Sequence, residues 1–452
     1  MTLYDRVVRG NLIAPAGRLE GGWLAVAGGR IAAIGIGEAP SAAAVSDFGE
    51  RFVLPGAVDG QTHAGSYRGL AGIEATTRSA VAGGVTTIVD MPYDNPDPLT
   101  GLAQLEAKVR AIESTSYCDV ALYGTLAKGQ PASDVALLAK AGIAALKISS
   151  FESHPTRFPR IPMSQTLDIL EAVAEVDLPV GLHNEDQEIV LARIGLAKRL
   201  GQNGIAYHSP SRPPAAELAA TAAFLELGAV TGAHVHIVHF SLPRGFALVD
   251  RYAREGARAT AELCVHYLAF DPDVDGERLG AKLKVNPPIR PGAREQLWRE
   301  LAAGRVAFVS SDHSSWPIDN KLTASIFDAG AGVPGLETLV PAFYTGLVAR
   351  GERAPEQAAA YLAERPAKFF GLWPQKGALA VGADADLMVL EEGAFVYDSK
   401  RAHDDLNWSP FDGQTFAVQV IATFVRGVPA FDGSQVVGSP GQGRFVPRRP
   451  AA

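Results

Sequence analysis

This chain has little of what marks several large classes of protein. It contains only 2 cysteines in 452 residues, Cys118 and Cys264, too few for a disulfide framework and in keeping with a reducing compartment. It has no run of about 20 apolar residues, and its first residues lack the order of a secretory signal. We therefore expect a cytoplasmic protein that neither spans a membrane nor is exported.

The chain also lacks a basic cluster suited to a phosphate backbone. Its 41 lysines and arginines stand against 49 aspartates and glutamates, which gives a net charge of −8. Nucleic acid is therefore not an expected partner. Hydrophobic residues make up 47% and charged residues 20%, which is typical of a globular protein with ample material for a core.

Short apolar runs bounded by turn-forming residues recur after the first fifty residues. There are eight, at 53–60, 86–91, 119–126, 144–150, 179–184, 235–241, 259–268 and 306–312. Helical periodicity occupies most intervals, for example 102–115, 163–176, 215–232 and 292–304. This alternation predicts an α/β protein with a closed (β/α)8 TIM barrel, and an open doubly wound sheet is the structural rival.

The two ends of the chain differ from this middle part. Residues 1–52 and 377–452 contain short alternating strands with glycine turns. We predict that the two ends pair into one small β-sandwich domain beside a barrel formed by residues 53–376.

Metal-ligand residue types occur at four of the eight predicted strand ends, where a barrel of this kind carries its chemistry. They are His63, His183, His239 and Asp312. Gln61 points the same way as His63 because side chains alternate along a strand. Each of these residues alone has an ordinary structural interpretation, such as a core histidine or a helix cap. Their joint occurrence predicts a divalent metal centre.

Lys147 lies within the apolar fourth strand, where an ammonium is badly placed unless it is paired or chemically altered. His234 and His236 are an odd number of residues from His239 on the sixth strand, so we predict that they face away from it. His266 lies near the end of the seventh predicted strand and stays a further candidate ligand.

Longer motifs are spread over nearly the whole chain. They include LPGAVDGQTH, AGGVTTIVDMP, LHNEDQEIV, VHIVHFS, AELCVHYLAF, KVNPPIR, SSDHS and KGALAVGADADLMVL. Together they resemble the amidohydrolase superfamily, in particular its cyclic-amide branch of hydantoinases, dihydropyrimidinases, allantoinases and dihydroorotases. The resemblance implies a hydrolase that opens a cyclic amide C–N bond and, by analogy with the family, a homotetramer.

The resemblance also implies roles for the residues of the predicted centre. Lys147 would be N-carboxylated and bridge two divalent ions, with His63 and Asp312 on one ion and His183 and His239 on the other. Zinc is the expected metal, and manganese, cobalt and nickel are alternatives. A hydroxide held by the metals would attack the ring carbonyl, with Asp312 as general base and then general acid.

The sequence departs from the family's pattern at four positions. Gln61 replaces the first histidine of a His-x-His pair, so the first metal is held weakly or is absent; alternatively Gln61 forms only hydrogen bonds to residues near the metal. Gly65 and Tyr93 replace an arginine and an asparagine of dihydroorotases, which ranks that activity low. Glu152 replaces a tyrosine of hydantoinases, which leaves hydantoinase-like and allantoinase-like activity nearly tied.

We expect the substrate to be a small cyclic amide or ureide, in contact with Asn286 and the backbone near Gly332 by resemblance. Two other functions stay open. The chain is a non-catalytic scaffold if the loss of a histidine at Gln61 reflects loss of activity, and the shared fold also permits a single-metal deaminase or deacylase.

Overall fold

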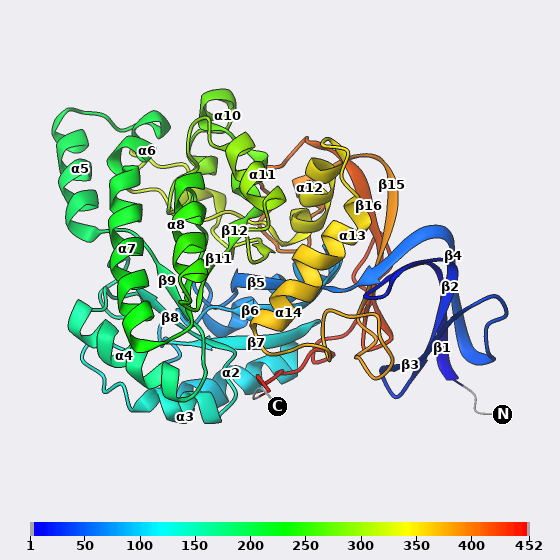
Figure 1. Ribbon diagram of the computed structural model, residues 1–452. Helices are drawn as coiled ribbons and strands as arrows, with labels where there is room; N and C mark the ends of the chain where they lie inside the picture. Colours follow the sequence, from blue (N-terminus) through cyan, green and yellow to red (C-terminus); the bar gives the residue numbers. More distant parts are fainter. Residues whose placement is uncertain (1–3, 450–452) are drawn as a thin grey trace.

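The computed structural model describes residues 4–449, which form a barrel with a smaller sheet domain at its side (Figure 1). Within this range every helix is too short or too polar to cross a lipid bilayer.

The barrel sheet consists of eight parallel strands in the order β11-β10-β9-β8-β7-β6-β5-β14. The strands are β5 (Ala57–His63), β6 (Val85–Asp90), β7 (Asp119–Gly124), β8 (Ala145–Ser149), β9 (Val180–His183), β10 (Val235–Ile237), β11 (Ala259–Ala261) and β14 (His313–Ser314). The parallel pair of β12 (Leu263–Cys264) and β13 (Val309–Ser310) links the segment after β11 to the segment before β14. The sheet is thereby closed, which confirms the predicted (β/α)8 barrel over the open alternative.

The barrel strands are buried on both faces because helices cover their outer side, which explains their continuous apolar runs. The main covering helices are α1 (Gly72–Ala82), α2 (Leu102–Thr115), α3 (Asp134–Lys140), α4 (Met163–Glu175), α7 (Pro214–Thr231), α8 (Pro243–Arg254), α11 (Arg294–Ala302) and α12 (Leu336–Val348). The other helices are α5 (Gln187–Arg199), α6 (His208–Ser211), α9 (Val265–Ala269), α10 (Pro272–Leu279), α13 (Ala354–Ala359) and α14 (Arg365–Phe369). The four helices expected from periodicity are confirmed.

Four predicted strands differ from the structure. The eighth, 306–312, contains only β13, and the backbone breaks at Asp312, which has a φ of 49°, before β14 begins at His313. The segment 53–60 is divided, because β4 (Ala42–Pro55) of the small domain runs through its first residues and the barrel strand begins at Ala57. The sixth strand ends at Ile237, before His239, whose φ of 41° is incompatible with a strand. The last part of 259–268 is wrong as a strand, because it forms helix α9.

The small domain is built from both ends of the chain, as predicted. Its seven-stranded sheet has the order β17-β16-β15-β4-β1-β2-β3, with β1 and β4 parallel and the other neighbours antiparallel. Besides β4, the strands are β1 (Tyr4–Ala14), β2 (Gly17–Ala27), β3 (Arg30–Ile36), β15 (Leu387–Val396), β16 (Thr415–Val425) and β17 (Val428–Phe431). Val8, Leu24, Val53, Leu387 and Phe424 belong to its core, which unites the two chain ends.

A buried ion cluster joins this domain to the barrel. Lys376 Nζ lies 2.7 Å from Asp386 and 2.9 Å from Asp384, and it also contacts Asp119 at the start of β7. These three carboxylates are close enough together to resemble a cation site, but the Lys376 ammonium already occupies their centre.

Candidate active site

A cavity of about 480 Å³ opens at the carboxyl ends of the barrel strands. Its wall includes side chains from the loops at 150–158 and 314–332. All five residues predicted as metal ligands line it, namely His63, Lys147, His183, His239 and Asp312. The barrel thus brings together residues that are up to 249 positions apart in the sequence, from 63 to 312.

Asp312 lies directly before the last barrel strand, β14, and contacts side chains of the first, β5. Gln61 Nε2 donates a hydrogen bond to Asp312 Oδ1 over 3.0 Å, and His63 Nε2 lies 3.4 Å from the same oxygen. His63 Nδ1 lies 3.0 Å from Ser66 Oγ, which fixes the ring. Gln61 and His63 therefore face the same way, as the strand alternation predicts, and both act on one carboxylate.

The two other histidines face each other across the cavity floor. His183 Nδ1 lies 3.0 Å from His239 Nε2, while the second nitrogen of His183, Nε2, lies 3.0 Å from Glu185 Oε2. Burial lowers the pKa of both imidazoles, so both are neutral near pH 7. Glu185 thereby occupies one nitrogen of His183 and leaves the other directed at His239.

Lys147 is only 1% exposed and lies on β8 beside this histidine pair. Burial lowers its pKa to about 8, although Glu262 and Asp312 oppose the shift. The same burial raises the pKa of Glu262 to about 8. An amine in this setting is partly uncharged near neutral pH, unlike a lysine at the surface.

His236 does not face away from the site, contrary to the prediction. Its Nε2 lies 3.6 Å from Glu262 Oε2, and Glu262 Oε1 accepts a hydrogen bond from the His239 backbone at 3.3 Å. The alternation fails because β10 ends at Ile237 and His239 leaves the extended conformation. His236 thus lies within the barrel, on Glu262.

Lys147, His183 and His239 form a donor set that fits a divalent ion. Neutral imidazole is a preferred ligand of zinc, and two nitrogens bound to one tetrahedral zinc lie about 3.3 Å apart. The observed 3.0 Å between His183 Nδ1 and His239 Nε2 is close to this spacing. The carboxylate at Glu185 that orients His183 is a common accompaniment of metal-binding histidines.

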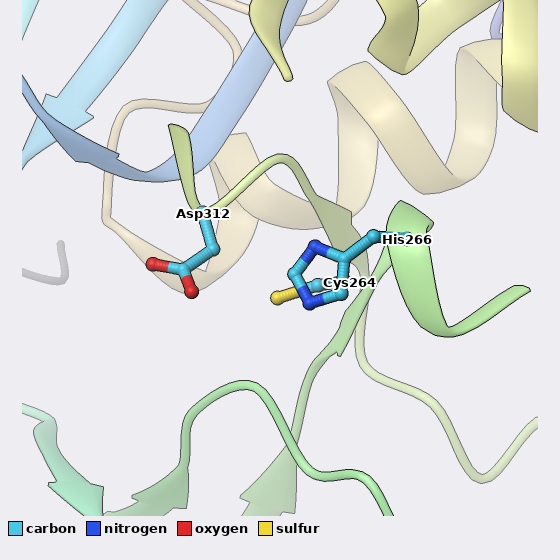
Figure 2. Close-up of side chains that lie close together, drawn as sticks. All are labelled: Cys264, His266 and Asp312. Atoms are coloured by element: carbon cyan, nitrogen blue, oxygen red, sulfur yellow. The ribbon is translucent and has the colours of Figure 1, made fainter. Parts of the chain in front are cut away.

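His266 and Cys264 also lie close to Asp312 (Figure 2). Their ligand atoms and a carboxylate oxygen of Asp312 lie within 4.8 Å of one another. Both ring nitrogens of the buried His266 are without a hydrogen-bond partner among residues 4–449. His266 therefore does reach the site, as its place near the seventh strand suggested.

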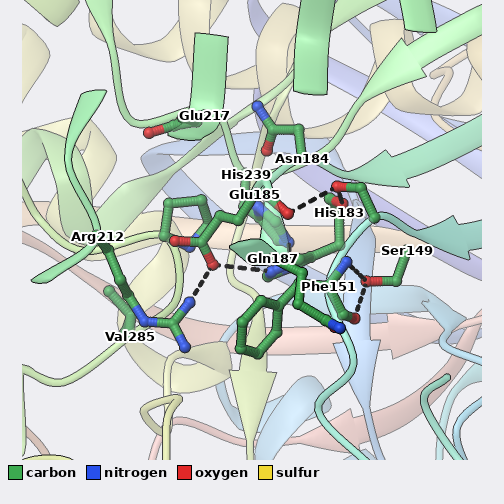
Figure 3. Close-up of polar contacts among 12 residues, drawn as sticks. Ser149, Phe151, His183, Asn184, Glu185, Gln187, Arg212, Glu217, His239 and Val285 are labelled. Atoms are coloured by element: carbon green, nitrogen blue, oxygen red, sulfur yellow. Dashed lines mark hydrogen bonds and ion pairs between the residues drawn. The ribbon is translucent and has the colours of Figure 1, made fainter. Parts of the chain in front are cut away.

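Sequence reasoning missed the buried pair of Glu185 and Arg212. Figure 3 shows Glu185 between His183 and the Arg212 guanidinium, which donates to the same Oε2. Burial by itself raises the pKa of Glu185, but the Arg212 charge prevails and lowers it to about 2. Arg290 in turn donates to the carbonyl oxygen of Arg212 and to Glu217 at 2.7 Å. The acidic residues directly after His183 in the LHNEDQEIV motif were the available signal.

The substrate side of the cavity combines an aromatic wall with polar groups. The rings of Tyr93 and Phe158 are stacked, with centroids 3.7 Å apart. Asn286 lines the cavity, and its Oδ1 is buried without a partner in the described part of the chain. Gly332 also lines it; its N–H donates to Lys284 O, and its oxygen accepts from Lys321 Nζ. Substrate contact by Asn286 and Gly332 stays a prediction.

Comparison with known proteins agrees with this geometry. Residues 52–430 match the model of the "Amidohydrolase family". The chain belongs to the amidohydrolase family. An allantoinase of Rubrobacter xylanophilus is 35% identical over 99% of this chain and 98% of its own, and a dihydroorotase of Halobacterium salinarum is 35% identical over 85% and 87%. The solved L-hydantoinase (dihydropyrimidinase) of Arthrobacter aurescens is similar to it with a TM-score of 0.94 and 30% identity, over 99% of this chain and 100% of its own.

These amidohydrolase relatives confirm the predicted cyclic amidohydrolase branch. They also confirm the expectation of an enzyme, a hydrolase that acts on carbon–nitrogen bonds in cyclic amides. A divalent metal agrees with the family and with the donor residues present in the cavity.

Proposed function

We propose that this amidohydrolase opens the ring amide of a hydantoin, allantoin or a related ureide in the cavity at the barrel mouth. The observation that carries the proposal is the pair of neutral imidazoles, His183 and His239, whose nitrogens face each other at 3.0 Å beside Lys147. Asp312 lies in the same cavity, so metal ligands and a proton acceptor share one space.

Lys147, His183 and His239 would hold a divalent ion, for which zinc is the expected identity. We propose that Lys147 is N-carboxylated, because its buried amine, with a pKa of about 8, is available in the neutral form that reacts with carbon dioxide. The product is an anionic carbamate, and the amine proton leaves to solvent. This reaction replaces an unfavourable buried ammonium by an anionic metal ligand.

A divalent ion bound there supplies the positive charge that polarises a carbonyl and makes water nucleophilic at neutral pH. Asp312 takes the proton of the attacking water and delivers it to the leaving ring nitrogen. Gln61 holds Asp312 through Oδ1, which leaves Oδ2 to exchange the proton.

Two features of the cavity favour a planar cyclic amide, and a third disfavours dihydroorotate among such substrates. The stacked Tyr93 and Phe158 provide an aromatic wall for a flat ring. The unpartnered Asn286 Oδ1 is an acceptor suited to a ring N–H. At Gly65 a Cβ would lie 1.9 Å from Asp94 Oδ1, so the arginine of dihydroorotases would require Asp94 to move.

A panel of cyclic amides tests the proposal. Zinc-loaded protein is assayed with hydantoin, 5-substituted hydantoins, dihydrouracil, allantoin and dihydroorotate, and Asp312→Ala is the control. We expect turnover of a hydantoin or of allantoin that the variant lacks. Inactivity with every member of the panel would refute the cyclic-amide reaction and leave the deaminase or deacylase and the scaffold as the alternatives.

We further propose that the chain forms a homo-oligomer, a tetramer by family analogy. In support, α5 and the residue after it expose Leu191, Leu196 and Leu200, with 53%, 41% and 62% of their surfaces accessible. Leu196 and Leu200 are four residues apart and so lie on one face of the helix, and exposed apolar patches are typical of surfaces that associate. Light scattering on the purified protein measures the state directly, and a monomeric mass would refute this proposal.

A further inference from the structure

We infer that this chain holds one tightly bound divalent ion rather than two. A second ion would need a ligand atom from residue 61, and the Gln61 amide instead directs an N–H group at Asp312. The inference rests on the proposed function and specifies its metal centre. It depends on two donor groups in the cavity, one around His183 and one around Asp312, which differ in chemistry.

The group around His183 has imidazole nitrogens that are available to bind a metal. His183 Nδ1 and His239 Nε2 face each other at 3.0 Å, and His183 Nε2 is already occupied by Glu185. A hydrogen bond between two imidazole nitrogens needs a proton on only one of them, so the other nitrogen keeps its lone pair. Lys147 lines the same cavity, so three potential ligands share one space.

Around Asp312, in contrast, the polar side chains contact one another. Gln61 Nε2 donates to Asp312 Oδ1 over 3.0 Å, and His63 Nε2 lies 3.4 Å from that oxygen. Gln61 is 0% exposed, so solvent does not compete for this bond. One imidazole and one carboxylate remain as conventional ligands, and the carboxylate already receives a hydrogen bond.

The orientation of the Gln61 amide follows from chemistry. An ionised carboxylate only accepts hydrogen bonds, so the NH₂ end must face Asp312; the reverse orientation would place two oxygens 3.0 Å apart. An amide nitrogen has no free lone pair for a metal. The amide oxygen, a weak zinc ligand, is turned away from Asp312 Oδ1 and is buried without a partner within residues 4–449.

Gln61 therefore acts as a positioning residue that orients Asp312 by a hydrogen bond. A histidine at position 61 would replace an N–H donor by an imidazole, which is a good ligand. The substitution Gln61→His would then complete a second metal site from His63 and Asp312. Gln61→Leu, in contrast, removes the hydrogen bond without supplying or removing a ligand.

The metal content of the purified protein tests the inference independently of enzymatic activity. Each protein is loaded with excess Zn²⁺, passed through a desalting column and analysed by mass spectrometry of the metal, and folding is checked by circular dichroism. We expect about one Zn²⁺ per chain in the wild type and in Gln61→Leu, about two in Gln61→His, and almost none in a His183→Ala His239→Ala double variant. Titration of the metal-free wild type by calorimetry should show a single tight binding event.

Two tightly bound ions in the folded wild type would overturn the inference. His266→Ala then locates the second ion, because its loss in that variant would assign it to the Cys264, His266 and Asp312 group. The outcome is separable from the proposed function, because inactivity with every cyclic amide would refute that function even where the wild type holds one ion.

Discussion

Glu185 Oε2 lies 3.0 Å from Nε2 of His183, and this contact determines which nitrogen of the imidazole faces the cavity. Arg212 keeps the Glu185 carboxylate ionised, with a pKa of about 2 despite its complete burial. An ionised carboxylate at Nε2 favours the tautomer that has its proton there and leaves the lone pair on Nδ1. The orientation of His183, a proposed metal ligand, is thus set by a residue outside the proposed ligand set.

Glu185→Gln should weaken zinc binding by about 10- to 100-fold, because a neutral amide orients the imidazole less well and makes it a poorer base. Competition with a chelating dye measures the dissociation constant. Glu188→Gln on the exposed side of α5 is the matched control and should leave it unchanged. Equal affinities for wild type and Glu185→Gln would show that the Glu185 contact does not orient His183 for metal binding.

Asp312→Asn should lower kcat by about 10²- to 10⁴-fold on any substrate identified, because the amide cannot accept the proton of water. The variant preserves the size of the side chain, so its melting temperature should stay close to that of the wild type. A steady-state assay with a thermal melt checks both quantities. A kcat within a few-fold of the wild type would exclude Asp312 as the base.

Lys376→Met should lower the free energy of unfolding by about 3–5 kcal/mol, because it leaves the carboxylates of Asp119, Asp384 and Asp386 buried without their ammonium. The exposed pair of Lys368 and Glu364 provides the control, since Lys368→Met should cost about 1 kcal/mol or less. Urea unfolding measures both. Similar small losses would mean that the cluster contributes little to the junction of the two domains.

Lys284, on the cavity wall, should make stability increase with pH. Burial, with a contribution from Arg212, lowers its pKa to about 7, whereas the unfolded chain keeps a value near 10.5. Between these values the unfolded state binds one more proton, so the free energy of unfolding rises by up to about 1.4 kcal/mol per pH unit from this group.

The difference between wild type and Lys284→Met isolates this contribution. Urea melts from pH 7 to pH 10 should show the wild type gaining stability relative to the variant as pH rises. A difference that does not change over this range would mean that Lys284 stays charged in the folded protein.

Helices, strands and the residue types of the site were predicted well where they depend on neighbouring residues in the sequence. The helix predicted at 102–115 ends at the observed residues, and the side chains of Gln61 and His63 face one way as the alternation requires. Predictions failed where the backbone leaves its regular conformation. His239 has a positive φ, so the alternation that should separate it from His236 does not extend that far.

The sequence by itself therefore determined the series of strands and helices, the ligand types at the strand ends and the unusual Gln61, because periodicity and residue type are local properties. Only the tertiary structure decided how these groups pair. The Gln61–Asp312 hydrogen bond spans 251 positions, and the Glu185–Arg212 pair comes from two loops whose conformations no local pattern specifies. Hydrogen bonding and burial depend on distances through space, and these are fixed only when the barrel closes.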